Sequence, residues 1–442
     1  MNLKSLSLVL GALSLGASAM AADLWMCSNN GIQRIVTLSP VDGSVVDQNF
    51  ITMSGVSSGL IARCATQIDD RIYMSVTANN VVQVYTLDGV LVNSITVATP
   101  NGIRYINGEV YVCSGGTPKQ VIRMTKSGLV LGSFTVPDSP MDVIQVGSEL
   151  RVSIYNASQT TNISAIQRYS LTGIDLGALY TNIAGPQQIQ PLSNGNLLVG
   201  GFVQTGTRPS GIYDITSAGT LAPGLPNPFA IGWKVRGVAL LDTGNYLMTK
   251  ADGIFLYNKA TDLETSLTTG SGHFINRVKY TSADISANNP ALTGTDRLRN
   301  VFVELRDTSN GSVVASFTKV GGFGPALSAT ARTFANNGNY DIAIRSEGTL
   351  WRILRNQPFN INSALNASVT LVSGDIKADN IVDIGDYSQL AMAFDATSGD
   401  ANWATPNGEG IAPRDCDLTN DGFVDIADYT VLAANFDASG DN

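Results

Sequence analysis

A turn that ends in glycine recurs at nearly constant spacing through the first half of this 442-residue chain. In each copy a strand-like run leads into the turn, a small or acidic residue stands before the glycine, and another strand-like run follows. The turn glycines are 46, 39, 45 and 46 residues apart, at Gly43, Gly89, Gly128, Gly173 and Gly219. The segment Ala260-Thr261-Asp262 is a degenerate sixth copy. A repeat of this length, with about four short strands in each unit, predicts small antiparallel sheets arranged one after another.

The sequence around these turns repeats as well, since Gln83–Gly89 is similar to Ile122–Gly128 and to Gln167–Gly173. Residues 60–267 supply five full units. The strand at 273–280 lacks partners, and residues 23–50 supply only three strands, so joining them makes a sixth unit from both ends and leaves no open sheet edge. We predict a six-bladed β-propeller over residues 22–281, resembling NHL- or quinoprotein-like propellers. A two-sheet sandwich or a β-solenoid is the alternative.

A different strand pattern fills residues 282–373. Asn288-Asn289-Pro290 interrupts the repeat and predicts a linker. Alternation within Val301–Leu305 and Tyr340–Ile344 predicts half-buried antiparallel strands. We predict a small β-sandwich that resembles the immunoglobulin-like or carboxypeptidase-regulatory-like modules of secreted bacterial proteins, with the role of a spacer or a partner surface.

The N-terminal residues predict export. Lys4 precedes an apolar run from Leu6 to about Leu15, and small residues lead to Ala21, so residues 1–21 are predicted to be a signal peptide. The run is shorter than the ~20 residues that cross a membrane. We therefore expect a secreted protein, extracellular or associated with the cell surface, with no membrane span. Among the cysteines, Cys27, Cys64 and Cys113 either form one disulfide after export or remain buried thiols.

Negative charge is concentrated at the C-terminus. The whole chain has a net charge of −9, whereas residues 374–442 hold 14 acidic residues against Lys377 and Arg414, a local net charge of −12. Crowded carboxylates repel one another unless cations neutralise them, and nucleic acid or an anionic membrane is a poor partner for such a surface.

Residues 417–428 fit the twelve-residue loop that binds calcium. Ca²⁺ takes roughly six to eight oxygen ligands, which a short loop supplies only by curling tightly. Gly422 at the sixth position permits the positive φ of that turn. The expected ligands at positions 1, 3, 5, 7, 9 and 12 are Asp417, Thr419, Asp421, the carbonyl of Phe423, Asp425 through a water, and Asp428.

A damaged copy of this loop lies upstream, over residues 375–386. Asn380 replaces the glycine and tolerates the left-handed conformation. Lys377 stands at position 3, where an ammonium group cannot ligate a cation, so this loop is predicted to bind more weakly or with Lys377 turned outward. The expected ligands here are Asp375, Asp379, the carbonyl of Ile381, Asp383 and Asp386.

A helix pattern follows each loop, over Tyr387–Ala396 and Tyr429–Ala438. A duplicated loop and helix without the leading EF-hand helix resembles a type I dockerin, here over residues 374–442. The resemblance implies an α-helical, EF-hand-like module that binds Ca²⁺ and docks onto a cohesin-like or other extracellular protein. Two features depart from cellulosomal dockerins: the loops start 42 residues apart, and Ile384-Gly385 and Ile426-Ala427 replace the hydroxyl pairs before position 12.

Two classes of function are compatible with this mainly β organisation. The favoured hypothesis is a non-catalytic recognition or scaffold protein, with a carbohydrate among the candidate ligands of the propeller. The alternative is a dockerin-tethered hydrolase or lyase acting in polysaccharide degradation, which would need two carboxylates facing one cleft. The single histidine, His273, is interpreted as a strand residue. The acidic residues of the repeats form no paired motif: Asp69, Asp70, Glu109, Asp142, Asp214, Asp242 and Asp252.

Overall fold

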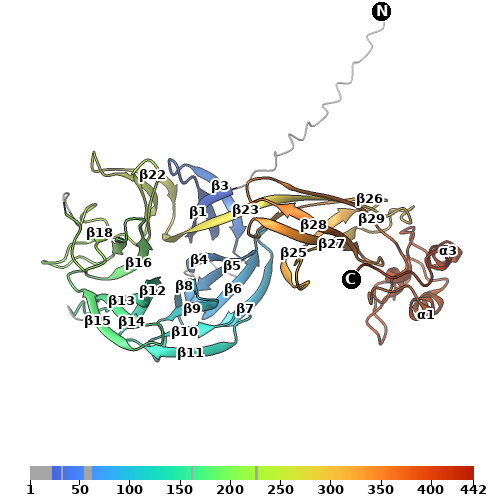
Figure 1. Cartoon of the computed structure of the whole chain (residues 1–442), viewed down its shortest axis with the longest axis horizontal. Helices are drawn as coiled ribbons and strands as arrows, with labels where there is room; N and C mark the ends of the chain where they lie inside the picture. The colour runs from blue at the N-terminus through green and yellow to red at the C-terminus, as the bar shows by residue number, and fades with distance from the viewer. Residues whose placement is uncertain (1–21, 31–32, 54–61, 161–162, 224–226) are drawn as a thin grey trace, which may run out of the picture.

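The computed structural model describes residues 22–30, 33–53, 62–160, 163–223 and 227–442. The predicted signal peptide, residues 1–21, lies outside the described residues. Strands dominate the described part of the chain, and its α-helices lie near the C-terminus (Figure 1). None of the helices in these ranges is long and apolar enough to cross a membrane.

Small antiparallel sheets, most of them built from consecutive strands, occupy the first part of the chain. One sheet contains β4 (Ala62–Ile68), β5 (Arg71–Val76), β6 (Val81–Thr86) and β7 (Leu91–Thr96). The next contains β8 (Pro100–Ile106), β9 (Glu109–Ser114), β10 (Gln120–Met124) and β11 (Val130–Thr135). Then come β12 (Ser139–Val146), β13 (Glu149–Tyr155), β14 (Ala165–Ser170) and β15 (Asp175–Tyr180). They are followed by β16 (Pro186–Pro191), β17 (Leu197–Gly201) and β18 (Gly211–Ile215), and by β19 (Val238–Leu240), β20 (Tyr246–Thr249), β21 (Gly253–Asn258) and β22 (Leu263–Thr269).

The first strand of each of these sheets lies at a common centre. The central strands β4, β8, β12, β16, β19 and β23 (Gly272–Asn288) contact one another in this order, and β23 in turn contacts β4. They are largely buried, whereas the strands at the far ends of their sheets, such as β7, β11 and β15, are mostly exposed. This part of the chain, here called the ring, is therefore propeller-like (Figure 1).

The sheet that contains β23 joins the two ends of the ring. Its other strands are β1 (Ala22–Asn29), β2 (Arg34–Leu38) and β3 (Val45–Thr52). β1 pairs with β2 on one side and with β23 on the other, so that Trp25 faces both Leu38 and Arg277. The pairing of the N-terminal strands with the segment 273–280 agrees with the sequence prediction, and it gives β1 no free edge.

The turn glycines of the repeats have a structural reason. All five have positive φ, between 78° and 94°, which an L side chain adopts only with strain. They also lie against the neighbouring sheet: a Cβ on Gly173 would come within 2.4 Å of Phe134, and one on Gly219 within 2.3 Å of the carbonyl oxygen of Leu179. In the degenerate copy Asp262 takes the positive φ, at 53°.

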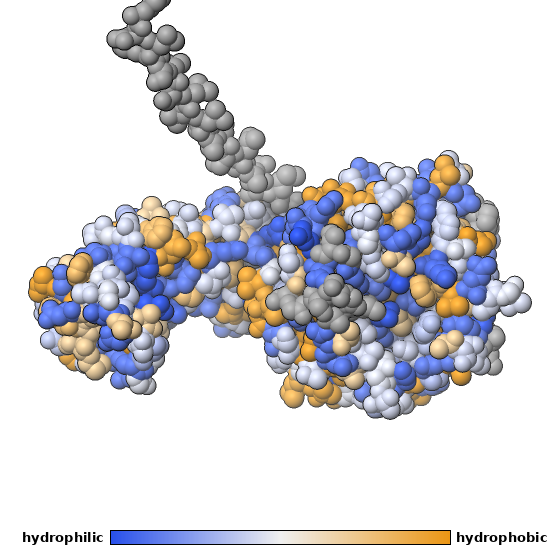
Figure 2. Space-filling model, turned by 180° about the vertical axis from the view of Figure 1, so that it is seen from behind, coloured by the Kyte–Doolittle hydropathy of each residue, from blue (hydrophilic) through white to orange (hydrophobic). Residues whose placement is uncertain are grey.

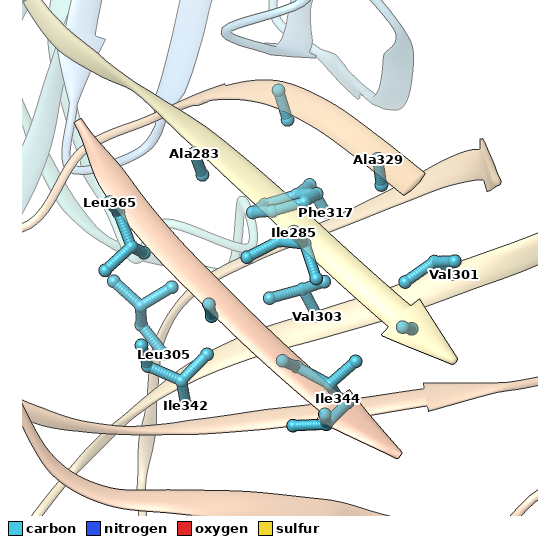
Figure 3. Close-up of a cluster of buried hydrophobic side chains, with 14 of the residues drawn as sticks. Ala283, Ile285, Val301, Val303, Leu305, Phe317, Ala329, Ile342, Ile344 and Leu365 are labelled. Atoms are coloured by element: carbon cyan, nitrogen blue, oxygen red, sulfur yellow. The ribbon is translucent and has the colours of Figure 1, made fainter. Parts of the chain in front are cut away.

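A β-sandwich follows the ring. One sheet contains β24 (Arg299–Asp307), β25 (Val313–Gly322), β27 (Gly338–Ser346) and β28 (Arg352–Phe359), and the other joins β26 (Ala326–Thr333) and β29 (Leu365–Thr370) to the second half of β23. Ile285, Val303 and Ile344 belong to the buried cluster between these sheets (Figure 3). The predicted boundary between residues 281 and 282 falls inside β23, which runs unbroken from the ring into the sandwich.

Polar contacts also join the ring to the sandwich. The backbone N–H of Arg332 donates to Asp88 at 3.0 Å, and its guanidinium group donates to the carbonyl oxygen of Phe50 at 3.2 Å. On β25, in the other sheet of the sandwich, the backbone N–H of Ser316 donates to Asp70 at 3.1 Å. Together with the shared strand, these bonds attach the sandwich to one side of the ring.

All four cysteines are buried free thiols, which decides between the two alternatives for Cys27, Cys64 and Cys113. Burial raises the pKa of Cys27 to about 12 and that of Cys64 to about 11. Both groups therefore remain protonated at neutral pH and act as small apolar side chains.

Candidate metal centre

The C-terminal module contains α1 (Ile384–Ala393), α2 (Pro413–Cys416) and α3 (Ile426–Ala434). α1 and α3 begin before the predicted starts at Tyr387 and Tyr429, and they end before Ala396 and Ala438. The reason is a capping box: the side chains of Asp383 and Asp425 cap the helices, and the carboxylates of Asp386 and Asp428 accept the N–H groups of these two caps. The last residues of each loop thus already form the first helical turn.

The first position of each loop holds a buried carboxylate that organises the turn. Asp417 accepts the backbone N–H groups of Asp421 at 3.2 Å and Gly422 at 3.0 Å. Asp375 accepts those of Asp379 at 3.0 Å and Asn380 at 3.2 Å. The two loops therefore curl in the same way despite their different residues at position 6.

The carboxylate at position 12 closes each loop from the other side. Asp428 accepts the backbone N–H of Thr419 at 2.9 Å and its hydroxyl at 3.1 Å. Asp386 accepts the backbone N–H of Lys377 at 2.9 Å. Both residues are fully buried, as is Asp417, and Asp375 is 1% exposed. Each loop thus encloses two buried acidic groups.

Burial and mutual repulsion disfavour the charged form of these groups. Desolvation, and next the nearby carboxylate of Asp386, raise the pKa of Asp375 to about 6. Desolvation is also the main cause that raises the pKa values of Asp386, Asp417 and Asp428. A cation between the carboxylates would remove this cost, because it supplies the opposite charge that the loop lacks.

The donor set fits a hard cation. Carboxylate, hydroxyl and carbonyl oxygens are the ligands that Ca²⁺ takes, and the sharp turn is present, with φ of 89° at Gly422 and 72° at Asn380. In the described residues no three His, Cys, Asp or Glu side chains converge into a metal-binding group. Asp379, Asp383, Asp421 and Asp425 instead accept N–H groups two residues further along the chain.

Lys377, the unfavourable residue of the first loop, forms an ion pair outside it. Its Nζ lies 3.4 Å from the carboxylate of Glu409, which belongs to the long insert between the repeats. The backbone of Lys377 meanwhile keeps the loop bond to Asp386. This agrees with the hypothesis that the ammonium group turns outward.

The two repeats exchange backbone hydrogen bonds. Val424, at position 8 of the second loop, pairs with Asp395 and Ala396, which follow α1. Val382, at position 8 of the first loop, pairs with Asp437 and Ala438, which follow α3. Each loop thus pairs with the end of the other repeat, and both valines are buried in the module core.

The second loop is also bound to the sandwich, which the sequence did not predict. The side chain of Asn420, fully buried, donates to the carbonyl oxygens of Arg297 at 2.8 Å and Phe323 at 3.0 Å. It accepts the Nε–H of Arg299 at 3.2 Å, and Arg299 also donates to the carbonyl of Asp417. The sequence indicates this position only through the residue type, because asparagine tolerates the positive φ that the structure shows here, at 63°. Loop and sandwich therefore form one packed unit.

The acidic residues of the ring do not gather at one site. Asp142 is fully buried and forms an ion pair with Arg104, with an oxygen–nitrogen distance of 2.6 Å. Glu109 pairs with Arg123 on an outer strand, and Asp70 lies at the junction with the sandwich. Asp142, Glu109 and Asp70 thus each have a structural partner, and they lie on different sheets or at different ends of them.

No protein-family model and no curated protein matches the chain. A solved structure of virginiamycin B lyase from Staphylococcus aureus matches with 15% identity and a TM-score of 0.39, covering 60% of this chain and 93% of that one. A chain of a nidogen–laminin complex matches with 12% identity and a TM-score of 0.42, covering 58% and 98%. A cohesin–X–dockerin complex from Acetivibrio cellulolyticus matches with 18% identity and a TM-score of 0.27, covering 36% and 97%. At these values the matches concern the arrangement of strands and helices alone.

Proposed function

We propose that this chain is a secreted, calcium-binding recognition or scaffold protein without catalytic activity. Its ring is a six-bladed β-propeller that binds a ligand, and its C-terminal module is a dockerin-like unit that docks onto another extracellular protein. The observation that carries the proposal is the duplicated loop. In each copy one buried carboxylate starts the loop and a second lies in the first turn of a helix with matched exposed apolar residues.

Bound calcium would compensate for the repulsion between the buried carboxylates inside each loop. Asp375 and Asp386 are buried together in one loop, and Asp417 and Asp428 in the other. Bound Ca²⁺ would draw on these carboxylates, the carbonyls of Ile381 and Phe423 and the hydroxyl of Thr419, and it would hold the loop against the following helix.

The docking surface consists of apolar residues that occur at the same place in both repeats. Ile384 and Ile426 are each 65% exposed, and Tyr387 and Tyr429 are each 39% exposed. The two tyrosine rings touch edge to face, with centroids 6.0 Å apart, so the two helices present one surface. Apolar residues reach the surface at this end of the molecule (Figure 2). Such matched exposure fits a protein partner with an apolar face, such as a cohesin-like domain.

Calorimetric titration of the full chain with Ca²⁺ tests the proposal. We expect two unequal binding events, the tighter of which is lost in Asp428→Asn because this substitution removes one charge from the intact loop. The matched control is Asp400→Asn, which changes an exposed carboxylate in the insert of the same module. Equal calcium affinity in the wild type and Asp428→Asn would contradict the assignment of this loop.

A further inference from the structure

A cavity of about 390 Å³ opens where the central strands of the ring begin. Arg63, Asn101, Gln187 and His273 line it, and each is the second residue of its strand: β4, β8, β16 and β23. Met141 from β12 and Arg236, just before β19, complete the circle. Every sheet of the ring thus contributes to one cavity at the centre, of a volume usual for small-molecule sites.

Positive charge dominates this cavity. Arg63, Arg236 and Lys119 line it against a single carboxylate, that of Asp138, which accepts the side-chain amide of Asn156 at 2.5 Å and the N–H of Ser139 at 2.7 Å. No described residue accepts a hydrogen bond from the guanidinium group of Arg63, and its Nε is buried without a partner. Desolvation, and next the charge of Arg236, lower the pKa of Arg63 to about 10.

Arg104, three residues further along β8 than Asn101, gives the contrast. Arg104 donates to both carboxylate oxygens of Asp142, at 3.0 Å and 2.6 Å, and to Asn276 at 2.7 Å. Arg236 forms no such ion pair with a described carboxylate: it donates to Ser271 and lies 5.1 Å from the ring of Phe202. Desolvation lowers the pKa of Arg236, and the charge of Asp252 partly offsets this effect.

The imidazole of His273 has a nitrogen without a hydrogen-bond partner among the described residues. The residue is 2% exposed, and its Nε2 lies 3.3 Å from a guanidinium nitrogen of Arg236. Because a guanidinium group only donates, Nε2 is the accepting nitrogen and Nδ1 carries the proton. Nδ1 has no partner among the described residues.

We propose that this cavity binds a carboxylate-bearing saccharide, a uronate residue, whose carboxylate lies between Arg63 and Arg236. Two guanidinium groups provide paired N–H donors that match the two oxygens of a carboxylate. Gln187 offers an amide group for sugar hydroxyls, and so does Asn101, whose Nδ2 also donates to the carbonyl oxygen of Pro140 at 2.8 Å. The rings of Tyr155 and Phe202 offer apolar walls for the sugar ring. The inference rests on the proposed recognition role of the ring and gives its ligand a chemical class.

Binding of uronate trisaccharides to the full chain tests this assignment by calorimetry. The probes are trimers of galacturonate, glucuronate, mannuronate and guluronate, each compared with its methyl ester, which replaces the charged carboxylate by a neutral group with one added methyl. We expect at least one acidic trimer to bind, and its ester to bind at least tenfold more weakly. Arg63→Gln should reduce affinity at least tenfold, whereas Arg123→Gln, which removes a surface arginine paired with Glu109, should leave it unchanged.

A ligand-free measurement separates binding from folding. Since Arg63 and Arg236 repel each other, Arg63→Gln should leave the melting temperature unchanged or raise it, as is usual when a binding residue is removed. A lowered melting temperature would assign Arg63 a structural role and overturn the proposal. So would the absence of binding by all four trimers, equal binding of acid and ester, or stronger binding of a sulfated neutral trimer or of a simple monocarboxylate. Titrating the wild-type chain with Ca²⁺ as well distinguishes the uronate site from the proposed calcium-binding function. If the chain binds a uronate trimer but no Ca²⁺, only the proposed function is contradicted.

Discussion

Single residues in the ring combine a backbone requirement with a packing requirement. Each turn glycine needs a positive φ, and several also lie so close to the neighbouring sheet that no side chain fits. Asp262 shows that a polar residue can meet the first requirement alone, since its carboxylate accepts the hydroxyl of Tyr257 at 2.8 Å while φ stays positive. Contacts between adjacent sheets, which leave no room for a side chain at several of these turns, thus explain the regular spacing of glycine.

Replacing two glycines separates these requirements. Gly195 has a φ of 85°, and no atom lies within 4 Å of the position that a Cβ would take, so Gly195→Ala should cost about 1 kcal/mol of unfolding free energy through backbone strain. Gly173→Ala adds a clash with Phe134 and should cost about 1–3 kcal/mol more. Denaturant unfolding of both variants measures the difference, and equal losses would show that the contact with Phe134 relaxes freely.

At the scale of elements, the calcium loops do not stand alone. Each loop forms backbone bonds with the end of the other repeat, and the second loop is bonded through Asn420 to residues of the sandwich. The first loop has its own contact, in which Asn380 accepts the N–H of Trp351 at 2.9 Å. A substitution in either loop should therefore also affect the stability of the adjacent sheet of the sandwich.

Asn420→Gly tests this coupling while it keeps the positive φ available. The substitution removes four side-chain hydrogen bonds to Arg297, Arg299 and Phe323, so we expect the sandwich and the module to lose about 2–4 kcal/mol of stability. Ala378→Gly is the matched control, since Ala378 holds the equivalent position in the first loop with a φ of 59°. Thermal unfolding of the full chain compares the two, and equal stability would show that the bonds of Asn420 contribute little.

At the scale of the whole molecule, two long-range connections decide the architecture. β1 joins the ends of the ring, and β23 continues from the ring into the sandwich. The charge distribution follows the same division, with the ring's cavity positive and the C-terminal module strongly acidic. In the proposed function, a cationic cavity recognises the ligand, whereas exposed apolar residues of an otherwise acidic module recognise the partner.

Removing β1 should open the ring. A chain that starts at Asn30 loses the buried side chains of Trp25, Met26 and Cys27 and exposes edges of both β2 and β23. We expect its melting temperature to fall by more than about 10 °C or the protein to aggregate, compared with a chain that starts at Ala22. Differential scanning calorimetry and size-exclusion chromatography measure both effects. An unchanged melting temperature in a monomeric protein would show that the ring does not depend on this strand.

The sequence alone determined what local pattern encodes: the repeat of small sheets, the partnership of its two ends, the strands of the sandwich and the paired loops. Glycine at positive φ and alternating apolar residues act within a few neighbours, so they are visible in a single sequence. The tertiary structure decided what depends on distant residues. In the structure β23 belongs to both the ring and the sandwich, the two helices begin at their aspartate caps, earlier than predicted, and Asn420 is hydrogen-bonded to the sandwich. The tertiary structure also brought Arg63, Arg236 and His273 together, because residues far apart in the chain become neighbours only when the sheets surround a common centre.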